Sequence, residues 1–202
     1  MSSIFERILS FLRKFQNYMK ISKVTAISRR YFVMNSFDGA MVALGIVLGS
    51  YTTEITDPRI IIGIGMGAGL AMFFSGFTGA YITERAERLR EYKELEHNLL
   101  KSLDETIHKK ALEIASLWVA IIDGGSPVVF LLIILSPFFF SILNLVSLGV
   151  AYALSILITF LALFLLGVFI GRISKENLII SGIKMLAAGL SVFAISLLIG
   201  GL

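Results

Sequence analysis

The sequence predicts an all-α integral membrane protein: five transmembrane helices, with a cytoplasmic helical hairpin between the second and the third. Of its 202 residues, 56% are hydrophobic and only 16% are charged, and the mean hydropathy is +0.87. In a soluble domain about a quarter of the residues are charged. The charges here gather in short blocks between long apolar stretches, each of which has the roughly 20 residues needed to cross a bilayer.

The first 28 residues predict an amphipathic basic helix that lies on the membrane surface. Between Ile4 and Phe15 apolar residues alternate with Arg and Lys, without the apolar core and the small-residue cleavage site of a secretory signal. The apolar side of such a helix faces the membrane, and its cations lie near anionic headgroups. Since no targeting segment is recognised, we expect a prokaryotic plasma membrane.

Residues 29–83 predict the first two transmembrane helices. We expect the first span from about Tyr31 to Thr53 and the second from about Arg59 to Thr83, joined by a short polar turn. The next block, 84–113, is rich in Glu, Lys, Arg and Leu and contains neither Gly nor Pro, a composition that favours helix. The second span should therefore continue out of the membrane as one long helix.

Residues 84–113 predict the cytoplasmic hairpin. Within this block, Ser102-Leu103-Asp104-Glu105 matches a capping box, in which the Ser and Glu side chains bond the first free backbone N–H groups of a helix. A second helix should begin here and lead directly into the third span.

Residues 114–202 predict the last three transmembrane helices. We expect the third span from about Ile114 to Leu135, interrupted at Asp123-Gly124-Gly125-Ser126-Pro127. Ser136-Pro137 should end it, because a residue before proline disfavours helical geometry. The fourth span is expected from about Ser141 to Ile170 and the fifth from about Asn177 to Leu202.

The distribution of Lys and Arg predicts the orientation. Seven of them precede the first span, seven lie in the 84–113 block, and Arg172 and Lys175 lie between the fourth and fifth spans. The opposite loops contain only Arg59, at a helix end. Because cytoplasmic loops carry the excess of Lys and Arg, the N-terminus and the hairpin should lie in the cytoplasm and the C-terminus outside.

Several classes of function are disfavoured. The chain has no cysteine, which excludes disulfides and thiolate metal sites. The net charge of +4 does not indicate nucleic acid as a partner, because the aromatic residues lie in the predicted spans. We expect no enzyme, since no nucleophile–base pair and no phosphate-binding loop is recognised. Ferroxidase chemistry at the Glu-x-x-His pairs described below is the one enzymatic alternative.

Three ionisable residues fall inside predicted spans. Asp38 lies about two turns into the first span, where a carboxylate is costly and is by default functional; the alternative is a carboxylate at the helix start, wetted by headgroups. Asp123 lies deeper, before glycines and a proline that would open the helix toward a cavity; the alternative is a structural pair with a neighbouring helix. Lys184 in the fifth span reaches the interface or pairs with Asp38 or Asp123.

Four pairs of glycines have the spacing that lets helix backbones approach closely. This spacing serves internal packing or dimerisation equally well, so the sequence does not separate the two. The pairs are Gly45 with Gly49, Gly63 with Gly67, Gly65 with Gly69, and Gly167 with Gly171.

The predicted hairpin contains both histidines of the chain, each in a Glu-x-x-His motif. Such motifs on facing helices hold metal in di-iron carboxylate bundles, and imidazole with carboxylate suits iron, manganese or zinc. The alternative is a solvated helix with many ion pairs, because Arg and Lys are interleaved with the carboxylates. The candidate metal ligands are Glu84, Glu87, Glu91, Glu94, His97, Glu105 and His108.

Three segments resemble the vacuolar iron transporter family. Asp38-Gly39 with Val47 and Gly49 matches the Asp-Gly…Val-x-Gly signature of its first helix, and residues 79–83 look like its Gly-Glu-Tyr-x-Ser segment. The stretch 185–200 is similar to its last helix. The resemblance covers nearly everything after residue 30. It implies five spans, a carboxylate-rich metal-binding insert after the second and a homodimer in the lipid bilayer.

This resemblance implies a transporter that exports Fe²⁺ or Mn²⁺ from the cytoplasm by proton antiport. Asp38 would take the metal into the membrane, and Asp123 would be a second ligand or a proton carrier. The sequence departs from the family at Gly76 and Ala80, where the family has Met and Glu; Met72, one turn earlier, could substitute. The loss of these two ligands motivates a different function, a non-transporting membrane protein whose hairpin docks a soluble partner.

Overall fold

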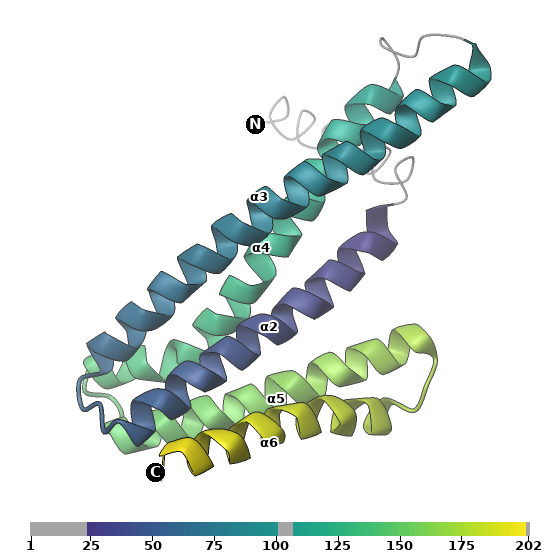
Figure 1. The fold of residues 1–202 in the computed structure, drawn as a ribbon. Helices are drawn as coiled ribbons and strands as arrows, with labels where there is room; N and C mark the ends of the chain where they lie inside the picture. Colours follow the sequence, from purple (N-terminus) through teal and green to yellow (C-terminus); the bar gives the residue numbers. More distant parts are fainter. Residues whose placement is uncertain (1–23, 101–106, 201–202) are drawn as a thin grey trace, which may run out of the picture. The chain divides into compact units, whose positions relative to one another are not determined.

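The computed structural model describes residues 24–100 and 107–200, and all its regular structure there is α-helical (Figure 1). The described part of the chain contains five helices that are long and apolar enough to cross a membrane. The predicted surface helix, apart from residues 24–28, and the capping box at 102–105 lie outside the described residues. The helices are α2 (Val24–Thr52), α3 (Pro58–Leu99), α4 (Ile107–Ile142), α5 (Leu148–Ser174) and α6 (Leu178–Gly200).

Helix α3 is longer than a membrane is thick. Its 42 residues correspond to roughly 63 Å at 1.5 Å per residue, whereas the hydrocarbon core of a bilayer measures about 30 Å. The apolar residues lie in its first half and the Glu, Lys and Arg residues in its second half. The prediction that the second span continues as one long helix is therefore confirmed.

Helix α4 corrects two expectations about the third span. It runs without a break through Asp123–Pro127, and it passes Pro137 to end at Ile142. A proline inside a helix removes one backbone hydrogen bond, and membrane helices tolerate this where side chains compensate. The Ser136 hydroxyl donates to the carbonyl oxygen of Ile133 at 2.7 Å, the group that Pro137 leaves without its helical donor.

The ends of α5 explain why the fourth span begins later than expected. Residues 141 and 142 still belong to α4, and α5 starts only after Ser147, whose side chain accepts a hydrogen bond from the Val150 N–H. At the other end Lys175 adopts a left-handed conformation with φ 58°, and its N–H donates to Gly171. Asn177 then caps α6 by accepting from the N–H groups of residues 179 and 180.

The chain divides into two compact units, and three helices contribute to both. The first unit comprises Met1–Phe32 and Ser75–Gly124, and the second comprises Val33–Phe74 and Gly125–Leu202. In the second unit a buried apolar cluster joins α2, α3, α4 and α5. In the first, Val24 of α2 packs against Ala115 and Val119 of α4. Each unit therefore has a core of its own.

Two hydrogen bonds between elements fix the core of the second unit. The buried Ser155 hydroxyl in α5 donates to the carbonyl oxygen of Ile134 in α4 at 2.6 Å. The Tyr152 hydroxyl donates to the carbonyl oxygen of Ile55, in the turn before α3, at 3.0 Å. The ring of Tyr152 also meets the ring of the buried Phe138 edge to face. These contacts join α5 to α4 and to the α2–α3 turn.

Candidate functional site

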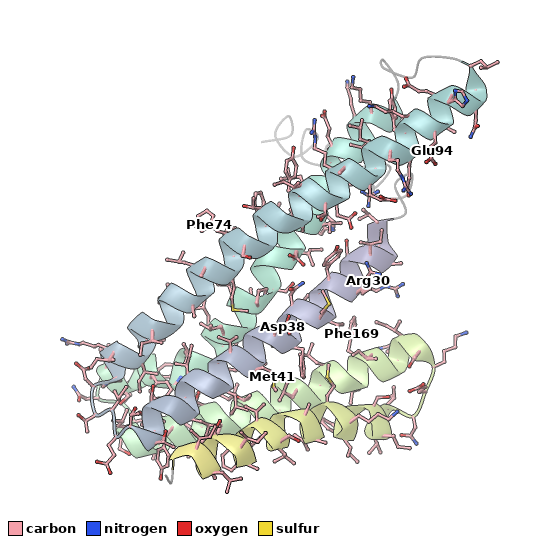
Figure 2. All side chains as sticks on the ribbon, viewed as in Figure 1. Arg30, Asp38, Met41, Phe74, Glu94 and Phe169 are labelled. Carbon is pink, nitrogen blue, oxygen red and sulfur yellow. The ribbon has the colours of Figure 1, made fainter. Side chains whose placement is uncertain are left out.

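Asp38 lies in the middle of α2, and its side chain is exposed (Figure 2). It follows the first residue of the helix by 14 positions, which is roughly 21 Å along the axis. Val42, Gly45 and Gly49 are exposed too and, at steps of four, three and four residues, continue the same side of the helix. We call these four residues the Asp38 stripe. It places a carboxylate on the outer surface of a strongly apolar helix.

The residue after Asp38 is packed against another helix. Gly39 is buried, and a Cβ at this position would lie 2.5 Å from the Cα of Pro127 in α4. The backbones of α2 and α4 therefore touch at Gly39 in the second unit. Asp38 lies about 100° around the helix from Gly39 and is exposed.

The four glycine pairs fall into two groups. At Gly45, Gly49, Gly63 and Gly67 an added Cβ would meet nothing within 4 Å in the described part of the chain. In contrast, a Cβ at Gly167 would lie 2.7 Å from the Cα of Gly182, so α5 and α6 pack closely there. Gly65 and Gly69 likewise face leucines of α4, Leu135 and Leu131. Two pairs thus serve packing within the chain, and two leave small residues on the surface of the second unit.

Asp123 has a different environment, inside the first unit. Only 8% of it is exposed, and its Oδ2 atom lies 2.9 Å from the position that a Cβ on Gly76 would take. Tyr31 of α2 interacts electrostatically with both Asp123 and Glu84. Gly76, at the position where the resembled family has Met, is therefore the residue that lets the Asp123 carboxylate lie against α3. Sequence reasoning noticed the missing Met but not this packing.

The two remaining candidate residues in the spans are Met72 and Lys184. Met72 is half-buried on α3. Lys184 is exposed on α6, and within residues 24–100 and 107–200 no ion pair joins it to a carboxylate. The prediction that its side chain extends to the membrane interface stays a prediction.

The carboxylates of the second half of α3 form ion pairs along the helix. Glu84 meets Arg88 at 3.2 Å, and the pair is largely buried. Arg90 contacts Glu87 at 2.8 Å and Glu94 at 3.7 Å, both on the exposed surface. The interpretation of this segment as a helix with many ion pairs therefore accounts for three of the predicted metal ligands.

The predicted Glu-x-x-His metal site stays a prediction. Glu91 and His97 are exposed, whereas Glu105 and the side chain of His108 lie outside the described part of the structure. Where side chains are described, no three His, Asp or Glu residues come close enough together to hold a metal ion. The motif that includes Glu105 and His108 is not covered by that observation.

Comparison with known proteins gives the chain a family. No protein-family model matches it. It is 40% identical over 167 residues to the uncharacterized protein MJ0645 of Methanocaldococcus jannaschii, and the match covers 81% of this chain and 83% of that protein. Identity at this level over most of both chains indicates common descent and a common fold. The chain belongs to the same family as MJ0645.

Proposed function

We propose that this protein is a homodimeric transporter that exports Fe²⁺ or Mn²⁺ from the cytoplasm in exchange for protons. The observation that supports it best is the Asp38 stripe: a carboxylate in the middle of an apolar helix, exposed on the surface of its own chain. The resemblance of the Asp38-Gly39 segment to the vacuolar iron transporters supplies the choice of metal.

The energetics of Asp38 favour a second copy as its neighbour. An Asp at the centre of a membrane helix costs about 2.5–3.5 kcal/mol or more, so such residues face a partner or a water-filled path. Gly45 and Gly49 lie on the same stripe, with open space around them, and glycines at this spacing allow another helix to approach closely. A two-fold axis beside the stripe would bring the Asp38 carboxylates of both subunits together.

A pair of carboxylates suits the proposed substrate. Two carboxylates offset the charge of one divalent cation, and oxygen ligands suit Mn²⁺. Protons bind to the same oxygens, which gives a physical basis for antiport. Met72 and Asp123 are proposed further along the path, and the carboxylates and histidines of the segment between α3 and α4 would collect Fe²⁺, Mn²⁺ or Zn²⁺ at the cytoplasmic mouth.

The proposed orientation follows from the Lys and Arg residues. The N-terminus and the segment between α3 and α4 lie in the cytoplasm, the C-terminus lies outside, and the membrane is a prokaryotic plasma membrane. In this orientation the ion-paired half of α3 extends from the membrane into the compartment from which metal is taken.

The test is metal flux through Asp38→Asn in proteoliposomes. Asn keeps the shape of the side chain and removes its charge, so we expect Fe²⁺ and Mn²⁺ flux, followed with a metal-sensitive dye, to fall at least tenfold. Asp57→Asn is the matched control. The Asp57 carboxylate accepts from the backbone N–H of Arg59 at 2.9 Å, and Asn caps a helix equally well. Flux through Asp38→Asn equal to that of native protein would show this mechanism to be wrong.

One observation favours the alternative, a membrane protein that docks a soluble partner. Glu87 and Glu94 are already engaged by Arg90, and the end of α3 exposes Leu95, Leu99 and Leu100, the last at 90%. The measurement that separates the two functions is the metal content of the purified protein beside that of a His97→Ala/His108→Ala double variant. A stoichiometric protein partner together with no bound metal would favour docking.

A further inference from the structure

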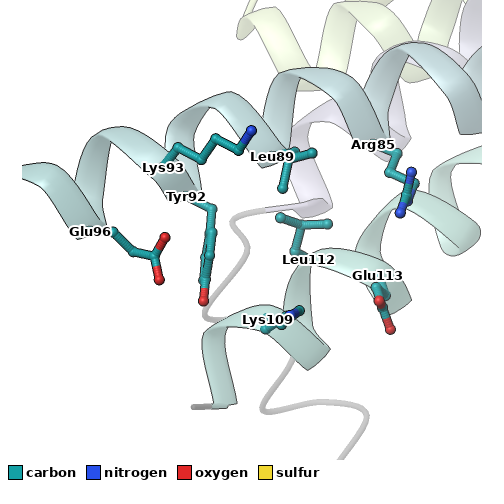
Figure 3. Close-up of a pocket in the computed structure, with 8 residues that line it drawn as sticks. All are labelled: Arg85, Leu89, Tyr92, Lys93, Glu96, Lys109, Leu112 and Glu113. Carbon is teal, nitrogen blue, oxygen red and sulfur yellow. The ribbon is translucent and has the colours of Figure 1, made fainter. Parts of the chain in front are cut away.

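The first unit contains a cavity of about 160 Å³ between the second half of α3 and the first turns of α4 (Figure 3). Its floor is apolar and includes Leu89, Tyr92 and Leu112. Tyr92 and Leu112 are both buried and pack against each other. Figure 3 shows the ring of Tyr92 reaching from α3 toward the start of α4. The two helices are therefore in contact at the apolar floor of the cavity.

The rim of the cavity has an excess of positive charge. Arg85 and Lys93 belong to α3, and Lys109 belongs to α4. All three are exposed. The two carboxylates of the lining, Glu96 and Glu113, lie at opposite ends of the close-up (Figure 3). Three cations against two carboxylates leave one unbalanced positive charge.

The cavity lies where α3 and α4 leave their apolar segments. Arg85 comes two residues after the expected end of the second span at Thr83, and Glu113 directly precedes the expected start of the third at Ile114. Along α3 the cavity extends from Arg85 to Glu96, roughly 16 Å at 1.5 Å per residue. The headgroup layer on each side of a bilayer is about 5–8 Å thick, so the cavity begins near this layer and continues beyond it.

We propose that this cavity binds the phosphate group of an anionic ligand, with Arg85, Lys93 and Lys109 as the phosphate-binding cations. The guanidinium of Arg forms paired hydrogen bonds with phosphate oxygens, and the two Lys add charge from both helices. Basic pockets on the cytoplasmic side of membrane helices bind phospholipid headgroups. The apolar floor suits the carbon part of a phosphate ester, and the excess of cations makes the cavity a poor site for the metal proposed above.

The experiment measures binding to the purified full-length protein in detergent by titration calorimetry. Two probes separate the possible sources of the phosphate group: a short-chain phosphatidylglycerol, with the matching zwitterionic phosphatidylcholine as its comparison of zero net charge, and inorganic phosphate. Binding of phosphatidylglycerol alone identifies a lipid site, and binding of both anions identifies a site for phosphate itself. If neither anion binds, the proposal is overturned.

Variants of the rim locate the site. A hydrogen bond to a charged group is worth about 1.5–3 kcal/mol, so Arg85→Gln should weaken binding of the anion about tenfold or more, and Arg85→Lys should weaken it less. The matched control is Arg90→Gln, which removes the same charge from the same helix at a position outside the cavity. Equal weakening by both Gln variants would indicate a diffuse charge effect and overturn the proposal. If Arg85→Gln does not fold, Lys93→Gln repeats the test at a second cation of the rim.

Discussion

Gly39→Ala is the sharpest test of how α2 and α4 pack. The added methyl group would lie 2.5 Å from the Cα of Pro127 and 2.8 Å from its carbonyl carbon, and closer still to its carbonyl oxygen. These are backbone atoms of a helix, so they cannot rotate away as a side chain can. The two helices would have to move apart, which removes contacts along the whole crossing.

The size of the effect follows from two opposing contributions. Replacing Gly by Ala inside a helix stabilises the helix by about 0.8–1.0 kcal/mol in water, whereas overpacking a close contact costs about 1–3 kcal/mol. Gly63→Ala, outside the Asp38 stripe, carries the first contribution without the second, because in the described structure its Cβ meets nothing within 4 Å. The difference between the two variants therefore isolates the clash, at about 1–3 kcal/mol.

The assay is thermal unfolding of both variants in the same detergent. For a chain of this length 1 kcal/mol corresponds to about 2–4 °C in Tm, so Gly39→Ala should unfold several degrees below Gly63→Ala. Equal Tm values would refute the close contact between Gly39 and Pro127.

Two further predictions concern the second unit. Gly49→Leu should reduce the dimer captured by chemical crosslinking in membranes without lowering the Tm of the monomer, because a Cβ at Gly49 meets nothing within 4 Å in the described structure; an unchanged dimer fraction would contradict the proposed interface. Ser155→Ala should lower the free energy of unfolding by about 0.5–1.5 kcal/mol, because it removes the buried hydrogen bond from α5 to the Ile134 carbonyl at 2.6 Å. Thermal unfolding measures this loss, and an unchanged Tm would show that this hydrogen bond does not stabilise the core.

The helices could be predicted because apolar stretches of this length have few alternatives to membrane helices. The continuation of α3 could be predicted because the charged segment after Thr83, rich in Glu, Lys, Arg and Leu and without Gly or Pro, favours helix and directly follows the apolar segment. The expectations at Pro127 and Pro137 were wrong because they treated proline as it acts in water. Inside α4 the loss of a backbone hydrogen bond at Pro137 is offset by the nearby Ser136 hydroxyl, and the helix continues.

The candidate site could be predicted less completely. The sequence predicts that Asp38 lies inside a membrane span. The residue pattern of one helix does not show which side of that helix the other helices cover. The four glycine pairs make the same point, since their spacing is identical and their surroundings are not. Whether such a pair packs within the chain or stays open depends on residues far away in the sequence, such as Gly182 opposite Gly167.

The two Asp-Gly pairs show how similar sequences acquire different chemistry. In Asp38-Gly39 the glycine is packed and the carboxylate is exposed, so Asp38 is free to meet a second subunit or a mobile ion. In Asp123-Gly124 both residues lie against Gly76, since a Cβ there would be 3.0 Å from the Cα of Gly124 and 2.9 Å from the Asp123 carboxylate. A buried carboxylate held between helices exchanges ions only if the helices separate. Asp38 is therefore the better candidate for binding metal in transit, and Asp123 is better suited to holding the α3–α4 contact.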